Sequence, residues 1–228
     1  MTAIIENVTV HGVFDMNASI IADDATGDCI VVDPGAQPQR FLDIAAGHGW
    51  NIRAMVVTHG HFDHIGAAVK LREATGAPVI AHKSSREYLE DPELNLSIHD
   101  GPGYRVMDAV YIDEGDTVVL SGGGVRIEHP GDAPAAAAVR LRCVFTPGHT
   151  RDSSIFIAEG PGMVFAGDTV YGEGPGTTEF PTGDEALLRA SIRDKVLARP
   201  DDLVLVIGHT GPCTVGDLRR TCLRIGWA

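Results

Sequence analysis

The chain has 228 residues, of which 44% are hydrophobic and 21% charged, values typical of a globular protein. Its formal net charge of −13 argues against a nucleic-acid-binding surface, because binding to phosphates needs clustered lysines and arginines. No stretch approaches the ~20 consecutive apolar residues of a membrane-spanning helix. We therefore expect one domain over residues 1–228, with neither a nucleic-acid nor a membrane partner.

The N-terminal segment MTAIIENVTVHG lacks the basic residues and the long apolar run of a signal peptide, which predicts a cytoplasmic protein. The cysteines show no CxxC spacing. In a reducing compartment they are expected to be buried thiols rather than a disulfide framework. They are Cys29, Cys143, Cys213 and Cys222.

Strand and helix signals alternate in the first part of the chain. In order, we expect strands at 4–10, 19–22 and 29–32, a helix at 37–47, a strand at 54–57, a helix at 66–75, a strand at 79–81 and a short helix at 84–90. This alternation favours an α/β arrangement in which helices cover a sheet.

A long loop is predicted at 92–108, a length usually associated with function or mobility. After it we expect strands at 109–112, 117–120, 124–128, 139–145, 154–158 and 163–166, then a helix at 184–197, a strand at 203–207 and a helix at 214–225. The segment 129–138 is expected to be a hairpin insertion. Because the second half roughly repeats the first, a four-layer αββα sandwich is the predicted fold, although periodicity alone indicates only an α/β protein rich in sheet.

The segment THGHFDH follows the strand predicted at 54–57 and contains His59, His61, Asp63 and His64. Ligand sites of α/β folds often lie between a strand and a helix. His59 and His61 can turn toward one point, whereas Asp63 and His64 can serve a second one. Imidazole and carboxylate groups suit divalent zinc, iron or manganese. A solvated polar loop is the alternative. Four residues cannot complete two metal shells, so a metal centre requires further ligands elsewhere in the chain.

Further candidate ligands follow three later apolar runs. His149 lies in CVFTPGHT, Asp168 in MVFAGDT, and His209 in LVLVIGHTG. One histidine after a strand is usually an ordinary residue, but the recurrence of this pattern indicates a metal centre. The other histidines lack such a position and are not expected to be ligands, although one of them, in the long loop, could touch a substrate: His11, His48, His82, His99 and His129.

These motifs together resemble the metallo-β-lactamase superfamily, with HxHxDH at 59–64 followed by PGHT, GDT and GHTG. The segments GDTVYGEGPGTTEFPTGDEALLRASIRDKV and IGHTGPCTVGDLRR resemble the short bacterial glyoxalase II-like (hydroxyacylglutathione hydrolase-like) enzymes. The resemblance covers nearly the whole chain. It implies a first metal held by His59, His61 and His149, a second held by Asp63, His64 and His209, and Asp168 as the bridging ligand.

The implied chemistry is thioester hydrolysis with two divalent metal ions, zinc first, with iron or manganese as alternatives. A carboxylate such as Asp168 can link metals about 3.5–4 Å apart, and their shared water, with its pKa lowered to roughly 7, supplies hydroxide as the nucleophile. Asp63 would act as the catalytic residue that orients this nucleophile. A thiolate, from a thiol of pKa ~8.5, leaves without a general acid, and the sequence offers no obvious acid.

Rival functions remain open at this point. The persulfide dioxygenases share the fold and use a single iron at His59, His61 and His149 together with Asp168, and the motifs do not exclude them. A non-catalytic metal-binding module is the other rival. Zinc β-lactamases carry a cysteine ligand where this chain has Asp168, which disfavours antibiotic hydrolysis.

Several residues have two interpretations. Asp33 in VVDPG either orients the metal-binding loop or only shapes a turn. Tyr171 and Tyr104 either line a substrate cleft or are structural, and Cys213 is either near the metals or simply buried. Thr177 stands where many relatives carry a basic residue, and the chain ends without their basic helical extension. We therefore expect a small-molecule thioester substrate with the glutathione-binding residues missing, and no particular oligomeric state is indicated.

Overall fold

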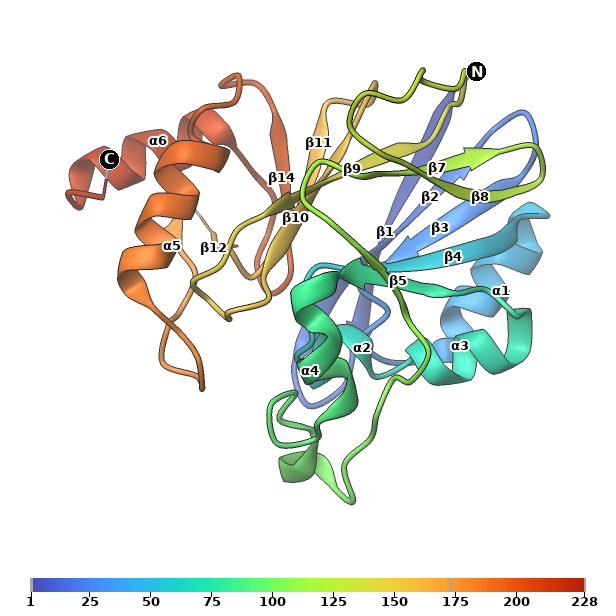
Figure 1. Cartoon of the computed structure of the whole chain (residues 1–228), viewed down its shortest axis with the longest axis horizontal. Helices are drawn as coiled ribbons and strands as arrows, with labels where there is room; N and C mark the ends of the chain where they lie inside the picture. Colours follow the sequence, from blue (N-terminus) through green and yellow to red (C-terminus); the bar gives the residue numbers. More distant parts are fainter. Residues whose placement is uncertain (1, 173, 228) are drawn as a thin grey trace.

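In the computed structural model, which describes residues 2–172 and 174–227, two sheets pack face to face between two layers of helices (Figure 1). Within the described residues the first sheet has six strands in chain order: β1 (Ala3–His11), β2 (Asp15–Asp23), β3 (Asp28–Val32), β4 (Asn51–Val57), β5 (Val79–His82) and β6 (Val110–Ile112). The pairs β1–β2 and β2–β3 are antiparallel, and the remaining pairs are parallel.

The second sheet has seven strands in the described part of the chain. Their spatial order is β15 (Cys213–Thr214), β14 (Val204–Ile207), β11 (Met163–Gly167), β10 (Ser154–Ala158), β9 (Arg140–Phe145), β7 (Thr117–Ser121) and β8 (Gly124–Glu128). A separate ribbon pairs β12 (Val170–Tyr171) with β13 (Gly174–Pro175).

Helices cover the outer face of each sheet (Figure 1). On the first sheet lie α1 (Pro38–His48), α2 (Phe62–Ile65), α3 (Ala68–Thr75) and α4 (Arg86–Glu90), and on the second α5 (Glu185–Ser191), which continues as a π-helical turn, Ile192–Val196, and α6 (Val215–Arg224). Short 3-10 turns occur at Lys83–Ser85 and Ser97–Asp100. No helix among the described residues is both long and apolar enough to span a membrane.

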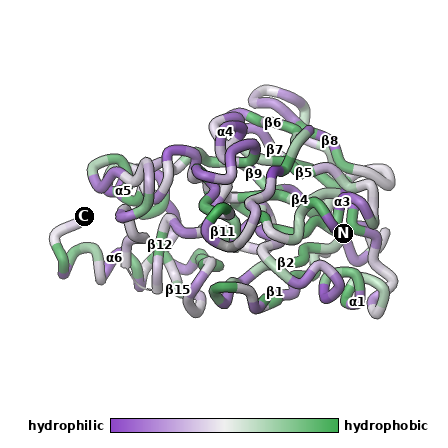
Figure 2. The backbone as a smooth tube through the Cα atoms, turned by 90° about the horizontal axis from the view of Figure 1, so that it is seen from below, coloured by the Kyte–Doolittle hydropathy of each residue, from purple (hydrophilic) through white to green (hydrophobic). Residues whose placement is uncertain are grey.

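Alternating side chains along the strands build separate cores, as β4 illustrates. Ala54 and Val56 point between the two sheets, whereas Met55 and Val57 point toward the helices of the first sheet. Because successive residues of a strand face opposite sides, a strand buried on both faces is continuously apolar. Figure 2 shows this hydrophobic colour along β4 and β5 inside the molecule. The predicted αββα sandwich is confirmed.

Local sequence signals account for where the helices begin and end. Pro38 starts α1, which ends at Gly49 in the left-handed conformation (φ 69°). A reciprocal capping box of Thr214 and Asp217 starts α6. These signals lie within a few residues of the helix end that they specify, and both helices match the sequence prediction to within a residue or two.

The prediction of a hairpin insertion at 129–138 is wrong. The strands on either side of it, β8 and β9, do not pair with each other but lie on opposite sides of β7. The segment therefore crosses over β7 as a connection. The prediction also missed β12, β13 and β15, because strands of two residues are too short to show alternation.

The two sheets are joined at the edge where the polar loops lie. The Ser154 amide of β10 donates to the Thr58 carbonyl after β4 (2.9 Å), and the Asn17 amide of β2 donates to the Gly208 carbonyl after β14 (2.7 Å). These hydrogen bonds connect segments far apart in sequence, so that the loops after β4, β9, β11 and β14 meet at one edge.

Candidate metal centre

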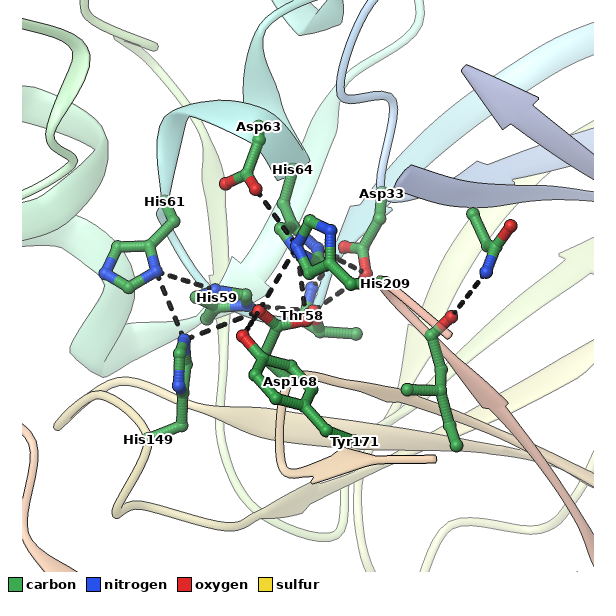
Figure 3. Close-up of polar contacts among 12 residues, drawn as sticks. Asp33, Thr58, His59, His61, Asp63, His64, His149, Asp168, Tyr171 and His209 are labelled. Atoms are coloured by element: carbon green, nitrogen blue, oxygen red, sulfur yellow. Dashed lines mark hydrogen bonds and ion pairs between the residues drawn. The ribbon is translucent and has the colours of Figure 1, made fainter. Parts of the chain in front are cut away.

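The predicted ligands meet at this edge, as Figure 3 shows. The loop after β4 and the start of α2 contribute four of them, and the loops after β9, β11 and β14 contribute the other three. Their donor atoms form overlapping groups within each of which all atoms lie within 4.8 Å: His59, His61 and His149; His59, His64 and Asp168; Asp63, His64 and His209.

The first group has the spacing of a metal-binding cluster. His61 Nδ1 lies 3.1 Å from His59 Nε2 and 3.2 Å from His149 Nε2. Two nitrogens bound to one tetrahedral zinc at ~2.0–2.1 Å are separated by about 3.3 Å. The three nitrogens therefore converge on a point at which a single cation fits.

In the second group, Asp168 faces donors on both sides. Its Oδ1 lies 3.2 Å from His64 Nε2, and its Oδ2 lies 3.4 Å from His209 Nε2 and 3.6 Å from His149 Nε2. His209 Nε2 is also 3.0 Å from Asp63 Oδ2. The Asp168 carboxylate thus lies between His149 on one side and His64 and His209 on the other, which is the placement that a bridging ligand needs.

The backbone holds the remaining ring nitrogen of two ligands, which orients their imidazoles. His149 Nδ1 lies 2.7 Å from the Thr177 carbonyl and His209 Nδ1 lies 2.9 Å from the Asp15 carbonyl, and each can only donate to that oxygen. A proton on Nδ1 leaves the Nε2 lone pair directed into the cluster. Such contacts behind a ligand fix its tautomer and orientation.

Asp33 makes contacts that go beyond shaping a turn. It has a left-handed backbone (φ 50°), and its two oxygens accept hydrogen bonds from the Thr58 amide (2.7 Å) and the Thr58 hydroxyl (2.8 Å). Its Oδ2 also lies 3.1 Å from His64 Nδ1. Asp33 therefore both turns the chain after β3 and holds the beginning of the loop that carries the histidines.

Glycines precede Asp168 and His209 for a steric reason. A Cβ on Gly208 would lie 2.3 Å from Asp168 Oδ1, and a Cβ on Gly167, where φ is 48°, would lie 2.3 Å from Thr58 Oγ1. The strand ends approach each other too closely for any side chain. The Gly-Asp and Gly-His pairs noted in the sequence are thus required by the packing of the cluster.

The donor set fits divalent cations. Among the described residues, His64 Nε2 and Asp168 Oδ1 are buried without a hydrogen-bond partner. Buried polar atoms are normally satisfied, so two such atoms 3.2 Å apart indicate a missing shared partner. A cation bound by imidazole and carboxylate groups would satisfy both.

The pKa shifts divide the histidines into two classes. Burial, reinforced by neighbouring histidines, lowers the pKa of His59 well below its ordinary value and that of His61 to about 3. Burial also lowers the pKa of His149. These imidazoles are therefore neutral at physiological pH, which is the form that binds a metal.

His64 and His209 behave in the opposite way because carboxylates surround them. Burial lowers the pKa of His64, but Asp168 and Asp33 outweigh it and hold this pKa well above its usual value. For His209, burial is likewise outweighed by hydrogen bonds with Asp168 and Asp63, and the pKa is about 10. The carboxylates thus favour positive charge at this end of the cluster, whether it comes from protons or from a cation.

The sequence analysis missed Asp152, which joins the two halves of the site. Asp152 is fully buried; its Oδ2 accepts the Gly60 amide (2.9 Å) and its Oδ1 accepts the Thr150 hydroxyl (2.7 Å). Gly60 lies between His59 and His61, so this carboxylate fixes the loop from the opposite sheet. Burial raises the pKa of Asp152 to about 6. Its position three residues after His149 is the only sequence signal.

A cleft of about 500 Å³ opens over the cluster. Tyr171 and Thr177, the predicted substrate residues, both line it, and the Tyr171 hydroxyl donates to Asp168 Oδ2 (2.7 Å).

Tyr104 lies instead along a neighbouring hollow and donates to the Phe62 carbonyl. The Cys213 thiol donates to the Gly172 carbonyl, directly after β12. All four cysteines are buried thiols outside any disulfide, as predicted.

The other histidines lie outside the donor groups found among the described residues. His82 stacks on Phe145, His48 stacks on Trp50, and His129 pairs with Asp116. His11 pairs with an exposed aspartate, and His99 is in the 3-10 turn of the long loop.

Comparison with known proteins gives a family and named relatives. Residues 11–209 match the sequence pattern of the metallo-beta-lactamase superfamily. The chain is 30% identical over 215 residues to the hydroxyacylglutathione hydrolase GloC of Haemophilus influenzae, over 91% of this chain and 92% of that protein.

Solved structures have the same fold. BLEG-1, named a B3 metallo-beta-lactamase, superposes with a TM-score of 0.79 at 26% identity, covering 94% of this chain and 95% of its own. TTHA1623 in a di-iron-bound form gives 0.76 at 25% identity, covering 95% and 98%. ETHE1 from Myxococcus xanthus gives 0.70 at 24% identity, covering 95% and 82%, a likeness of fold alone.

Proposed function

The chain belongs to the metallo-beta-lactamase superfamily, whose members are mostly metal-dependent hydrolases, and on that basis we propose that it is a dinuclear thioesterase of glyoxalase II type. The observation that carries the proposal is the convergence of imidazole and carboxylate donors into overlapping groups, with Asp168 between His149 on one side and His64 and His209 on the other. The 30% identity to GloC supports a thioester as the substrate.

In this proposal the first metal is held by His59, His61 and His149, the second by Asp63, His64 and His209, and both by Asp168. Two divalent cations bound there would lower the pKa of a shared water and polarise a carbonyl oxygen. Zinc is our first assignment. Iron is the alternative that the di-iron form of TTHA1623 supports, and manganese fits the same donors.

The protein's own groups orient the reactants. Asp63 lines the cleft, so its carboxylate can accept a hydrogen bond from the attacking water and hold it toward the carbonyl carbon. Burial and the adjacent Asp168 raise the pKa of Tyr171. The Tyr171 hydroxyl therefore stays protonated and fixes Asp168 by donating to it.

The reaction needs no separate general acid. Water adds to the thioester carbonyl, the carbon–sulfur bond breaks, and the products are a carboxylic acid and a thiol that takes up the proton from the water. A thiol of pKa ~8.5 leaves readily as thiolate, unlike an alcohol or amine. Asp15 and Glu179 also line the cleft, but a thiolate leaving group does not require either of them.

Elemental analysis of the purified protein combined with a thioester panel tests this proposal. We expect two metals per chain and thioester cleavage. In Asp168→Asn, metal content should fall below one per chain and kcat/KM should drop by at least about a thousandfold, because the shared ligand is lost. Asp43→Asn, at an exposed position on α1, is the matched control and should resemble the unmodified protein.

Other results would replace the proposal. One iron per chain with oxygen uptake on a persulfide would establish the dioxygenase alternative. Cleavage of a cephalosporin but of no thioester would establish a β-lactamase. Full activity in Asp168→Asn would refute the shared carboxylate itself.

A further inference from the structure

Two exposed phenylalanines flank the cleft, one beside each group of donors. The Phe14 ring, in the turn between β1 and β2, lies 6.2 Å from the His209 ring. The Phe180 ring lies 5.5 Å from the His61 ring. They are 52% and 41% exposed, so each presents an uncovered apolar face beside the position at which the scissile bond must lie.

Apart from the metal-binding residues, the charged side chains that line the cleft are of one sign. Besides the donor residues, Asp15 and Glu179 are the charged side chains lining it in the described part of the chain, and both are exposed. Lys70 lines a neighbouring hollow and not the cleft. The two are separated by a common wall, which consists of Phe14, Phe62 and Asp63. A carboxylate or phosphate on a part of the substrate remote from the metal centre would therefore meet carboxylates and no facing lysine or arginine.

This arrangement has consequences for binding. Packing apolar groups of a ligand against exposed aromatic rings lowers the free energy of the complex, because both surfaces are removed from water. Like charges in a cleft with low-dielectric walls repel each other more strongly than in water. Thr177 lies on the cleft wall and supplies only a hydroxyl and its backbone. A thiol carrier with an anionic tail gains no ion pair here.

Resting on the proposed thioesterase activity, we propose that the substrates are thioesters that are uncharged and apolar on both sides of the scissile bond. Phe14 and Phe180 pack against these apolar portions. Asp15 and Glu179 select against anionic thiol carriers such as glutathione.

A pair of substrates that differ only in charge tests the selection. S-benzoyl-3-mercaptopropionamide is neutral, and S-benzoyl-3-mercaptopropionate is its anionic counterpart with the same thioester. We expect kcat/KM to favour the amide by at least about tenfold at low salt and less at high salt, because salt screens exposed charges. The double variant Asp15→Asn/Glu179→Gln should reduce the preference to less than about threefold.

A second measurement tests the aromatic contacts. Phe180→Ala should raise KM for the neutral substrate by about fivefold or more while kcat changes little, because the lost contact stabilises the bound substrate and the transition state equally. Phe180→Leu should restore most of the affinity, since it restores apolar area.

The outcomes separate the two proposals. If neither compound is cleaved by protein that contains both metals, the thioesterase proposal fails, and this inference with it. If both are cleaved with equal efficiency, or the anion is preferred, the thioesterase stands and the substrate assignment is wrong. A preference that survives the double variant, or a KM unaffected by Phe180→Ala, also overturns the assignment.

Discussion

Replacing Asp152 tests how the two sheets hold the metal-binding loops together. Asp152 accepts hydrogen bonds from the Gly60 amide and the Thr150 hydroxyl and is fully buried. We consider two variants. Asp152→Asn removes the charge but keeps one acceptor oxygen, whereas Asp152→Ala removes both the charge and the acceptor.

The difference between the two variants measures the hydrogen bond. In Asp152→Ala the buried Gly60 amide loses its acceptor, which costs about 1–3 kcal/mol. The Thr150 hydroxyl retains Ser153 Oγ at 2.7 Å and adds little. For a domain of this size 1 kcal/mol corresponds to about 2–4 °C in Tm. We therefore expect the alanine variant to melt about 2–12 °C below the asparagine variant.

The charge predicts a pH dependence with a definite sign. Burial raises the pKa of Asp152 from 3.8 to about 6 in the folded protein, so folding favours the protonated form. The unmodified protein therefore loses stability relative to Asp152→Asn as pH rises from about 4 to 6. At neutral pH the free energy of unfolding of Asp152→Asn should therefore exceed that of the unmodified protein, by on the order of 3 kcal/mol.

Denaturant unfolding at pH ~4.5 and ~7.5 measures the stability difference between the variants and its pH dependence. The protein should be metal-free, because bound cations would change the pKa of a nearby carboxylate. Metal affinity, measured by competition with a chelator, should be retained in Asp152→Asn and reduced in Asp152→Ala. Equal stability of the two variants at both pH values, with equal metal affinity, would refute the role of Asp152.

Three further predictions concern the metal centre and the surface. Asp33→Asn should weaken metal binding about 10- to 100-fold in a chelator competition, because His64 loses the carboxylate behind its ring; unchanged affinity would restrict Asp33 to the turn. Chelation should lower Tm by roughly 10 °C with little change in far-UV circular dichroism, because a ligand at 1,000 times its Kd adds about 4 kcal/mol; an unaltered Tm would argue against resident metals. Hydrogen bonding to Asp116 raises the pKa of His129, so its NMR titration midpoint should lie above 6.5 and fall in Asp116→Asn, and stability linked to this pair should decline as pH rises through that midpoint; a midpoint insensitive to the substitution would contradict the pairing.

Local patterns were sufficient for most of the secondary structure. The continuous apolar run of β4 and the helix signals of α1 and α6 lie within or next to the elements that they specify, so sequence alone predicted them and the αββα fold. The ligand candidates were also visible in the sequence, because each follows an apolar strand and a glycine or a short turn. Strands of two residues were missed because they are too short to show alternation, and the crossover at 129–138 was missed because the sequence of a strand does not specify its pairing partner.

Only the tertiary structure decided how these candidates are arranged. Asp168 lies between groups whose members come from both ends of the chain, and Asp152 reaches Gly60 across more than ninety residues. The walls of the cleft include Phe14 and Phe180, which are adjacent to the donors only after folding. The physical reason is that residue type and spacing determine the local backbone conformation and which side chains are able to bind a metal or a proton. Which distant groups share a proton, a cation or a substrate depends on the packing of the two sheets.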